Sequence, residues 1–190
     1  RENIPEITGL PATAKGKNAA QAPEERTPQK VMLVSSWYYG DFVPYQAFIS
    51  DIAYLDFEVR LLAHLRDWGF EIIYKPHPFI ATRPPADFAK KYGGREINRP
   101  VEDVLHEADV LILPDPSSTA FATSLASSIP AVFIDLGLFT HSETASIAIQ
   151  QRCAIVSAAC GPDQRVSIDW DELHTALMLA NKSNDNSYFR

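Results

Sequence analysis

Polar side chains follow successive short apolar runs of the sequence, at the points where those runs end. Their hydroxyl, imidazole and ammonium groups donate hydrogen bonds or carry positive charge, which together suit a phosphate group. They are Ser35, Ser36 and Trp37 after the first run, Lys75 and His77 after the second, and Asp115, Ser117, Ser118 and Thr119 after the third. If the runs are parallel strands, these groups meet at one edge of the sheet. The sequence therefore predicts an anion-binding site there.

Ser118 stands where a predicted helix begins. The first turn of a helix has unpaired N–H groups and about half a positive charge, and it can hold an anion. Serine is also a common N-cap residue, so plain capping of the helix remains an alternative interpretation.

His77 lies between Pro76 and Pro78, which restrict the backbone and should fix the direction of the imidazole. Beside a phosphate, a histidine donates a hydrogen bond or carries a proton, and it would stabilise negative charge on a leaving group. A histidine with a purely structural role at a strand end is the alternative.

The elements that must position these groups alternate along the chain. Apolar runs predict strands at residues 31–35, 71–74, 110–113, 131–135 and 154–156, and helices are predicted at 52–68, 84–92, 101–108, 118–127, 142–151 and 169–181. Apolar strands joined by crossover helices are typical of a parallel sheet covered on both faces. We expect a single doubly wound α/β domain, Rossmann-like, with a mostly parallel sheet of about five to six strands.

The helix at 52–68 has apolar residues spaced by three and four, among them Ile52, Leu55 and Val59. This stripe predicts the buried face and assigns Glu58 and Arg60 to the helix surface. Residues 1–30 are rich in polar residues and predict a linker, the domain is expected at 31–182, and 183–190 form a polar tail.

Composition excludes several classes of protein. The 190 residues carry 17 Lys and Arg against 24 Asp and Glu, a net charge of −7, which argues against a non-specific nucleic-acid binder. No apolar run approaches the roughly 20 residues of a membrane-spanning helix. Cys153 and Cys160 have neither a disulfide framework nor metal-site spacing. These features favour a reducing, cytoplasmic setting without a metal.

Several nucleotide-site and hydrolase motifs are missing. The sequence has no G-x-G-x-x-G after the first strand, no G-x-x-x-x-G-K-[ST] and no G-x-S-x-G. The strand-end sequence Asp115-Pro116-Ser117 does not supply a D-x-D metal motif. Nicotinamide or flavin sites, P-loop enzymes and the α/β-hydrolases are therefore not favoured, and we expect no cofactor.

The sequences KPHP at 75–78 and ADVLILPDPSSTAFATSLASSIPAVFID at 108–135 resemble the C-terminal, donor-binding domain of GT-B glycosyltransferases. Within that class the chain is similar to bacterial surface-polysaccharide enzymes of the sialyl, Kdo or CDP-glycerol type. The resemblance implies that His77-Pro78 and Ser117-Ser118-Thr119 bind the donor phosphates, with Lys75 beside them and His77 in the catalytic role. Further donor contacts would come from Ser35, Ser36, Trp37, Asp115 and Thr123.

Thr123 stands where many of these domains have a glutamate that binds the nucleotide ribose, and Ser128 stands where they have a glycine. GT-B enzymes also have two such domains, and this chain holds one. The resemblance therefore implies a donor-binding half whose N-terminal partner domain supplies the catalytic base.

The implied reaction transfers a sugar or glycerol phosphate from a nucleotide-activated donor to a polysaccharide or glycolipid acceptor. No nucleic acid is expected as a partner. The implied location is cytoplasmic, with peripheral attachment to the inner face of the membrane left open. A non-catalytic nucleotide or sugar-phosphate binding module remains an alternative. So does a nucleotide-sugar epimerase, which would need further acidic residues facing the cleft; none is identified from the sequence.

Overall fold

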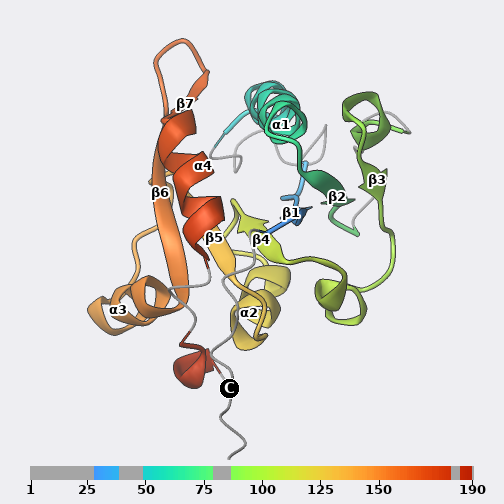
Figure 1. Cartoon of the computed structure of the whole chain (residues 1–190). Helices are drawn as coiled ribbons and strands as arrows, with labels where there is room; N and C mark the ends of the chain where they lie inside the picture. Colours follow the sequence, from blue (N-terminus) through green and yellow to red (C-terminus); the bar gives the residue numbers. More distant parts are fainter. Residues whose placement is uncertain (1–27, 39–48, 79–86, 181–184, 190) are drawn as a thin grey trace, which may run out of the picture.

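The computed structural model describes residues 28–38, 49–78, 87–180 and 185–189. These residues contain a seven-stranded sheet in the order β3-β2-β1-β4-β5-β6-β7 (Figure 1). Its strands are β1 (Lys30–Val34), β2 (Glu71–Lys75), β3 (Arg95–Glu96), β4 (Val110–Leu113), β5 (Ala131–Asp135), β6 (Cys153–Cys160) and β7 (Val166–Ile168). All neighbours pair in parallel except β6 and β7. The chain therefore reverses direction across the sheet between β1 and β4.

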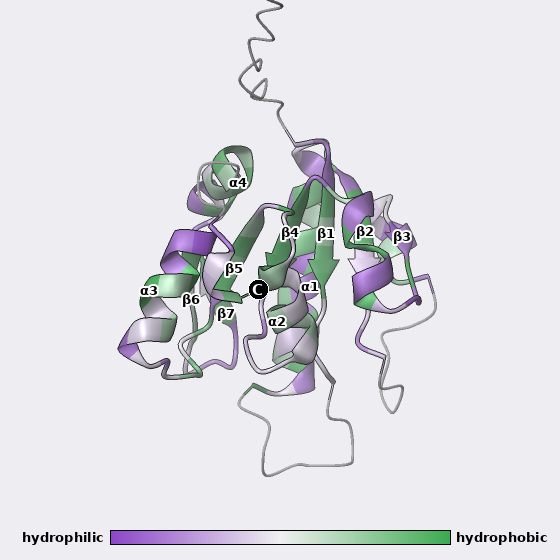
Figure 2. Ribbon diagram, turned by 90° about the horizontal axis from the view of Figure 1, so that it is seen from below, coloured by the Kyte–Doolittle hydropathy of each residue, from purple (hydrophilic) through white to green (hydrophobic). Residues whose placement is uncertain are grey.

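Helices cover both faces of the sheet. The helices α1 (Asp51–Asp67) and α4 (Trp170–Leu179) pack on one face, and α2 (Thr119–Ala126) and α3 (Glu143–Arg152) pack on the other. Side chains of β1 alternate between the two cores, with Val31 and Leu33 in the first and Met32 and Val34 in the second. Figure 2 shows the apolar central strands between these layers. The predicted α/β fold, Rossmann-like with a mostly parallel sheet, is confirmed.

The expected strand count of five to six is too low, because the two outermost strands are very short. The strand β3 has two residues and β7 has three. The strand β7 turns back to pair antiparallel with the last three residues of the longer β6. Segments of this length leave no recognisable apolar run.

The predicted helix at 101–108 is wrong. The segment forms two 3₁₀ turns, η2 (Val101–Asp103) and η3 (Leu105–Glu107). Of the predicted helix at 84–92, the described part contains only the 3₁₀ turn η1 (Ala89–Tyr92), and residues 84–86 lie outside the described residues. Segments this short can bury their few apolar side chains without completing α-helical turns.

The buried face of α1 differs from the predicted stripe. Ile52 is 82% exposed, whereas Tyr54, Phe57 and Leu61 are buried. The face is rotated so that Glu58 lies in its centre with no exposed surface. Assigning Glu58 to the helix surface was therefore wrong.

The predicted linker lies largely outside the described residues, and of the predicted tail, residues 185–189 are described. Within the described part, the backbone N–H groups of Gln29 and Lys30 donate to Asp109, which fixes the start of β1. Near the C-terminus, the 3₁₀ turn η5 (Ser187–Phe189) lies against α2. No helix among the described residues has the length and apolar character needed to cross a bilayer.

Candidate functional site

A pocket opens at the carboxyl ends of β1, β4 and β5, where the strand order reverses. This is the place at which open α/β sheets bind ligands. Its volume is about 450 Å³, part of it open to solvent. The wall comprises Ser36, Trp37, Ile49, Asp51, Tyr54, Pro114, Asp115, Ser117, Leu136, Leu138 and Phe139. Four of the residues singled out in the sequence, Ser36, Trp37, Asp115 and Ser117, therefore lie together.

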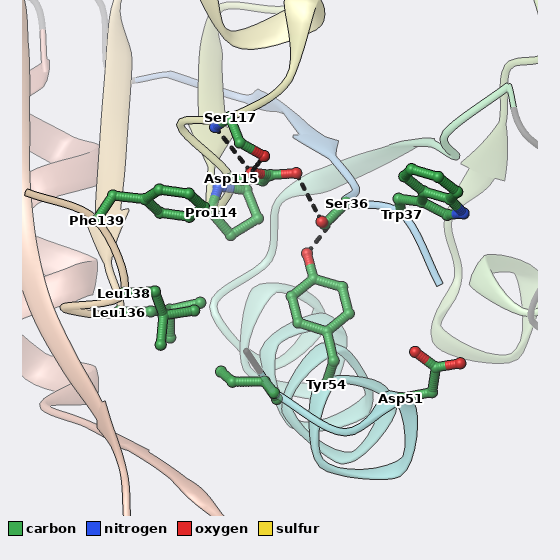
Figure 3. A pocket seen from close by; sticks show the side chains of 11 residues that line it. Ser36, Trp37, Asp51, Tyr54, Pro114, Asp115, Ser117, Leu136, Leu138 and Phe139 are labelled. Atoms are coloured by element: carbon green, nitrogen blue, oxygen red, sulfur yellow. Dashed lines mark hydrogen bonds between the residues drawn. The ribbon is translucent and has the colours of Figure 1, made fainter. Parts of the chain in front are cut away.

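Asp115 is the centre of the polar wall (Figure 3). Its Oδ2 accepts a hydrogen bond of 2.7 Å from the Ser36 hydroxyl. Its Oδ1 accepts from the backbone N–H of Ser117 at 2.9 Å and from the Ser117 hydroxyl at 2.6 Å. The three bonds fix the carboxylate and tie the end of β1 to the end of β4.

The opposite wall is apolar. Leu136, Leu138 and Phe139, which follow β5, lie across the pocket from Trp37 (Figure 3). The Trp37 ring stacks on the His77 imidazole, with ring centroids 5.9 Å apart and planes 9° from parallel. An apolar wall facing polar groups suits a ligand with one flat or apolar face and several hydroxyls.

Ser118 is the N-cap of α2, as the capping interpretation predicted. Its side chain accepts from the backbone N–H of Phe121 at 3.1 Å and its hydroxyl lies 3.2 Å from the Asp115 carbonyl oxygen. Thr119 is exposed in the first turn, and Thr123 lies partly buried one turn further along. Neither threonine belongs to the pocket wall. The helix therefore begins beside the pocket but turns Thr119 and Thr123 away from its wall.

His77 is partly buried beside Trp37, and burial lowers its pKa, an effect that Asp115 opposes and Lys75 adds to. The imidazole is therefore neutral at neutral pH and carries a single ring N–H. Lys75, predicted as a phosphate ligand, is only 5% exposed, and its ammonium donates to the Pro76 carbonyl oxygen at 2.8 Å. It lies at the end of β2 and is not part of the pocket wall.

Below the pocket lies a buried polar cluster that sequence reasoning missed. The Oε2 atom of Glu58 lies 2.6 Å from the Tyr38 hydroxyl and 2.8 Å from the Tyr74 hydroxyl. The Tyr74 hydroxyl also donates to the hydroxyl of Ser35 at 3.1 Å. Burial raises the pKa of Glu58, although the surrounding Ser35 and tyrosine hydroxyls favour its ionised form. The predicted site residue Ser35 belongs to this cluster, one layer below the pocket wall.

The cluster could have been found from the periodicity of α1. Counting from Tyr54 in steps of three and four gives Phe57, Glu58, Leu61 and Leu62 on one face. Asp51, which opens α1 and lines the pocket, was not singled out from the sequence. An acidic residue at the start of a helix is too common to be singled out without the fold.

The described residues hold no group of three or more His, Cys, Asp or Glu side chains arranged to bind a metal ion. Both cysteines are free thiols, and burial raises the pKa of Cys153 to about 12. No protein-family model matches the chain, and no curated protein matches it either.

Proposed function

We propose that the chain is a donor-binding domain of a glycosyltransferase that transfers a sugar or glycerol phosphate from a nucleotide-activated donor. One observation carries the proposal. Side chains that follow β1, β4 and β5 line a single pocket at the switch point, with hydroxyls and a fixed carboxylate facing an apolar wall. Such a pocket has an acceptor for sugar hydroxyls and an apolar surface for a ring.

The carboxylate of Asp115 determines where the sugar and the phosphates of the donor would lie. The negative charge of Asp115 opposes a phosphate at the polar wall, whereas a ribose or sugar hydroxyl can donate to it. The phosphates would then lie toward His77 and the start of α2, where an N–H donor and the helix dipole favour negative charge. This arrangement separates sugar from phosphate within one site.

In the proposed sugar transfer an acceptor hydroxyl attacks the sugar carbon, and the bond from that carbon to the phosphate oxygen breaks. In glycerol phosphate transfer the hydroxyl attacks the phosphorus that bears the glycerol, and the bond from that phosphorus to the bridging oxygen of the nucleotide breaks. A base on a partner domain takes the hydroxyl proton. His77 donates a hydrogen bond to the departing phosphate and stabilises its charge. The acceptor would be a polysaccharide or glycolipid, and the use of nucleotide donors places the reaction in the cytoplasm.

Titration calorimetry and thermal shift with CMP, CDP, UDP and GDP test this proposal. A ligand that binds only the folded chain raises its melting temperature. We expect a cytidine nucleotide to bind, and His77→Ala and Ser118→Ala to weaken binding by about tenfold, the loss of one charge-assisted hydrogen bond. Since Ser142 caps α3 as Ser118 caps α2, Ser142→Ala is the matched control and should bind as the parent does.

Proton uptake gives a second, independent readout. Because burial lowers the pKa of His77, a phosphate placed beside it must raise that pKa and draw in a proton. The apparent binding enthalpy should then vary with the ionisation enthalpy of the buffer, and this variation should vanish in His77→Gln. If no nucleotide binds at millimolar concentration, the donor site is not present in this chain alone.

Asp51 and Asp115 favour a second candidate, a nucleotide-sugar epimerase. Both carboxylates line the pocket, and a pair of acids is what proton removal and return at a sugar carbon requires. Incubating the chain with a nucleotide sugar and no acceptor distinguishes the two. Epimer formation that is lost in Asp51→Asn supports the epimerase, and an unchanged donor supports the transferase half.

A further inference from the structure

Ser36, a polar residue of the pocket wall, is held through all of its hydrogen-bonding groups. Its backbone N–H donates to the Tyr54 hydroxyl at 3.1 Å, and its own hydroxyl donates to Asp115. Its carbonyl oxygen lies 3.3 Å from the hydroxyl of Ser35, which donates to it. Two of these contacts are made with Tyr54 and Ser35, which both lie beside the buried Glu58. The geometry of the pocket wall therefore depends on the buried cluster around Glu58.

The cluster forms an unbroken row of oxygen atoms from Tyr38 to Ser36. The Tyr38 hydroxyl donates to Glu58 Oε2, which lies 2.8 Å from the Tyr74 hydroxyl. From there the Tyr74 hydroxyl reaches Ser35, and Ser35 reaches the Ser36 carbonyl oxygen. Five oxygen atoms thus form four successive contacts. Which way each one donates depends on where the protons are.

Counting protons decides the direction of the row. Each hydroxyl donates only once, so the Tyr74 proton cannot serve both Ser35 and an ionised Glu58. If Glu58 carries a proton on Oε2, the row becomes consistent: Tyr38 donates to Glu58, Glu58 to Tyr74, Tyr74 to Ser35 and Ser35 to Ser36. With ionised Glu58 the Tyr74 hydroxyl would donate to the carboxylate and Ser35 would donate to Tyr74, so the hydrogen bond from Ser35 to the Ser36 carbonyl oxygen would be lost.

The burial of Glu58 favours the same state. The side chain has no exposed surface, and Oε1 has no hydrogen-bond partner among the described residues. A carboxylate would place part of its negative charge on that unpaired oxygen, whereas a neutral carboxyl avoids this cost. Burial raises the pKa of Glu58 accordingly.

The titratable groups that face Glu58 do not offset its charge. They are Tyr54 on α1, Tyr38 beyond β1 and Tyr74 on β2, with Asp115 beyond β4 acting on Tyr54. The next cation along α1, Arg60, donates instead to Asp56 and to the Val166 carbonyl oxygen beside β7. The surrounding hydroxyls lower the pKa of Glu58, but the larger effect is burial, which raises it and favours the neutral carboxyl.

We propose that Glu58 is a positioning residue, held protonated at neutral pH, whose proton sets the direction of the hydroxyl row that fixes Ser36 at the pocket wall. Loss of that proton reverses the Tyr74 contact and releases the Ser35 hydroxyl from its ordered place. Ligand binding at the pocket then weakens as Glu58 ionises. This last step rests on the proposed function, whereas the protonation state of Glu58 does not.

Carbon NMR of chain labelled at the glutamate carboxyl carbons tests the protonation state without any ligand. The signal missing in Glu58→Gln assigns Glu58. We expect the Glu58 carboxyl to stay protonated through neutral pH, well above the value of about 4.3 at which a glutamate in a free peptide titrates. A Glu58 signal that titrates at or below about 4.3 overturns the proposal.

The link to the pocket has its own readout, the backbone amide signal of Ser36. It should shift with pH as Glu58 ionises in the parent chain and stay constant in Glu58→Gln and Tyr74→Phe. Tyr92, on η1, packs against the same hydrophobic core as Tyr74. Tyr92→Phe is therefore the control and should keep the pH-dependent shift of the Ser36 amide signal. A shift that persists unchanged in Glu58→Gln overturns the proposed link.

Binding of CMP at several pH values completes the test. We expect the affinity of the parent to fall as pH rises past the titration of Glu58, by up to about tenfold per pH unit, and Glu58→Gln to keep the low-pH affinity throughout. The same pH profile in both chains contradicts the role of Glu58 in binding. If CMP does not bind at any pH, the proposed function fails, and the two NMR measurements still decide the protonation state and the link.

Discussion

Two buried residues of opposite charge type lie on opposite faces of the sheet, and their surroundings differ. Arg152, at the end of α3, has no exposed surface and donates to carbonyl oxygens at the end of α2. Its Nε donates to Leu125 O at 2.8 Å, and its Nη2 lies 2.6 Å from Ile129 O, 3.1 Å from Ser124 O and 3.2 Å from Ser127 O. Glu58 has hydrogen-bond partners on one oxygen and none on the other, and Arg152 Nη1 likewise has no hydrogen-bond partner among the described residues.

The difference separates a structural charge from one that can titrate. A guanidinium stays protonated even when burial lowers its pKa, and the carbonyl oxygens at a helix C-terminus stabilise its positive charge. Arg152 therefore anchors α2, whose other end begins beside the pocket. The carboxyl of Glu58 can lose its charge and does so more readily because it is only half satisfied. A buried group that can change its charge beside a pocket is the feature that points to function.

Removing Arg152 should have the largest effect. In Arg152→Met the carbonyl oxygens of four residues each lose a donor inside the protein, so we expect the free energy of unfolding to fall by about 3–5 kcal/mol. Urea unfolding measures this. Arg60→Met is the matched control, since Arg60 is partly exposed, and it should cost about 1 kcal/mol or less. A loss for Arg152→Met no larger than for the control would remove the anchoring role.

Two substitutions of Glu58 should differ in how much they lower the free energy of unfolding. Glu58→Ala removes the partner of two tyrosine hydroxyls and opens a void, at a cost of about 2–4 kcal/mol in unfolding free energy. Glu58→Gln copies the neutral carboxyl and should cost about 1 kcal/mol or less. Chemical denaturation of both variants at neutral pH checks this difference. Equal losses would mean that the native side chain is ionised.

The pH dependence of stability gives a smaller and more specific effect. The pKa of Glu58 is raised above its ordinary value of 4.5, so its stabilising contribution is complete below pH 4.5 and is lost as pH rises through the folded-state pKa. Relative to Glu58→Gln, the parent should therefore lose stability as the pH rises from 4.5 to the folded-state pKa, by up to about 1.4 kcal/mol per pH unit. Arg152→Met should keep the parent's slope. A parent curve parallel to that of Glu58→Gln would contradict this prediction.

His77 should give the smallest effect, with the opposite sign. Its pKa is lowered from 6.5 by partial burial, so its contribution is present above pH 6.5 and is lost as pH falls through the folded-state value. Unfolding curves of the parent and His77→Gln should converge as the pH is lowered. Curves that stay parallel as the pH is lowered would contradict the prediction.

Much of the fold could be predicted because it follows from local periodicity. Apolar runs such as Val110–Leu113 can only be buried strands, and crossover helices between them imply parallel pairing. The same logic placed Ser36, Trp37, Asp115 and Ser117 at one sheet edge. The α-helix expected at 101–108 and the strand count were wrong because short segments carry too few residues to show a period.

The sequence by itself determined which residues follow the strands, because strand and helix periods are local properties of the chain. Only the tertiary structure decided which of those residues touch. The bond from Ser36 to Asp115 spans 79 positions and depends on the register of β1 against β4. The burial of Glu58 likewise depends on how α1 is rotated against the sheet, since Tyr74 comes from a different element. Rotation and register are set by the packing of whole faces, and no local pattern encodes them.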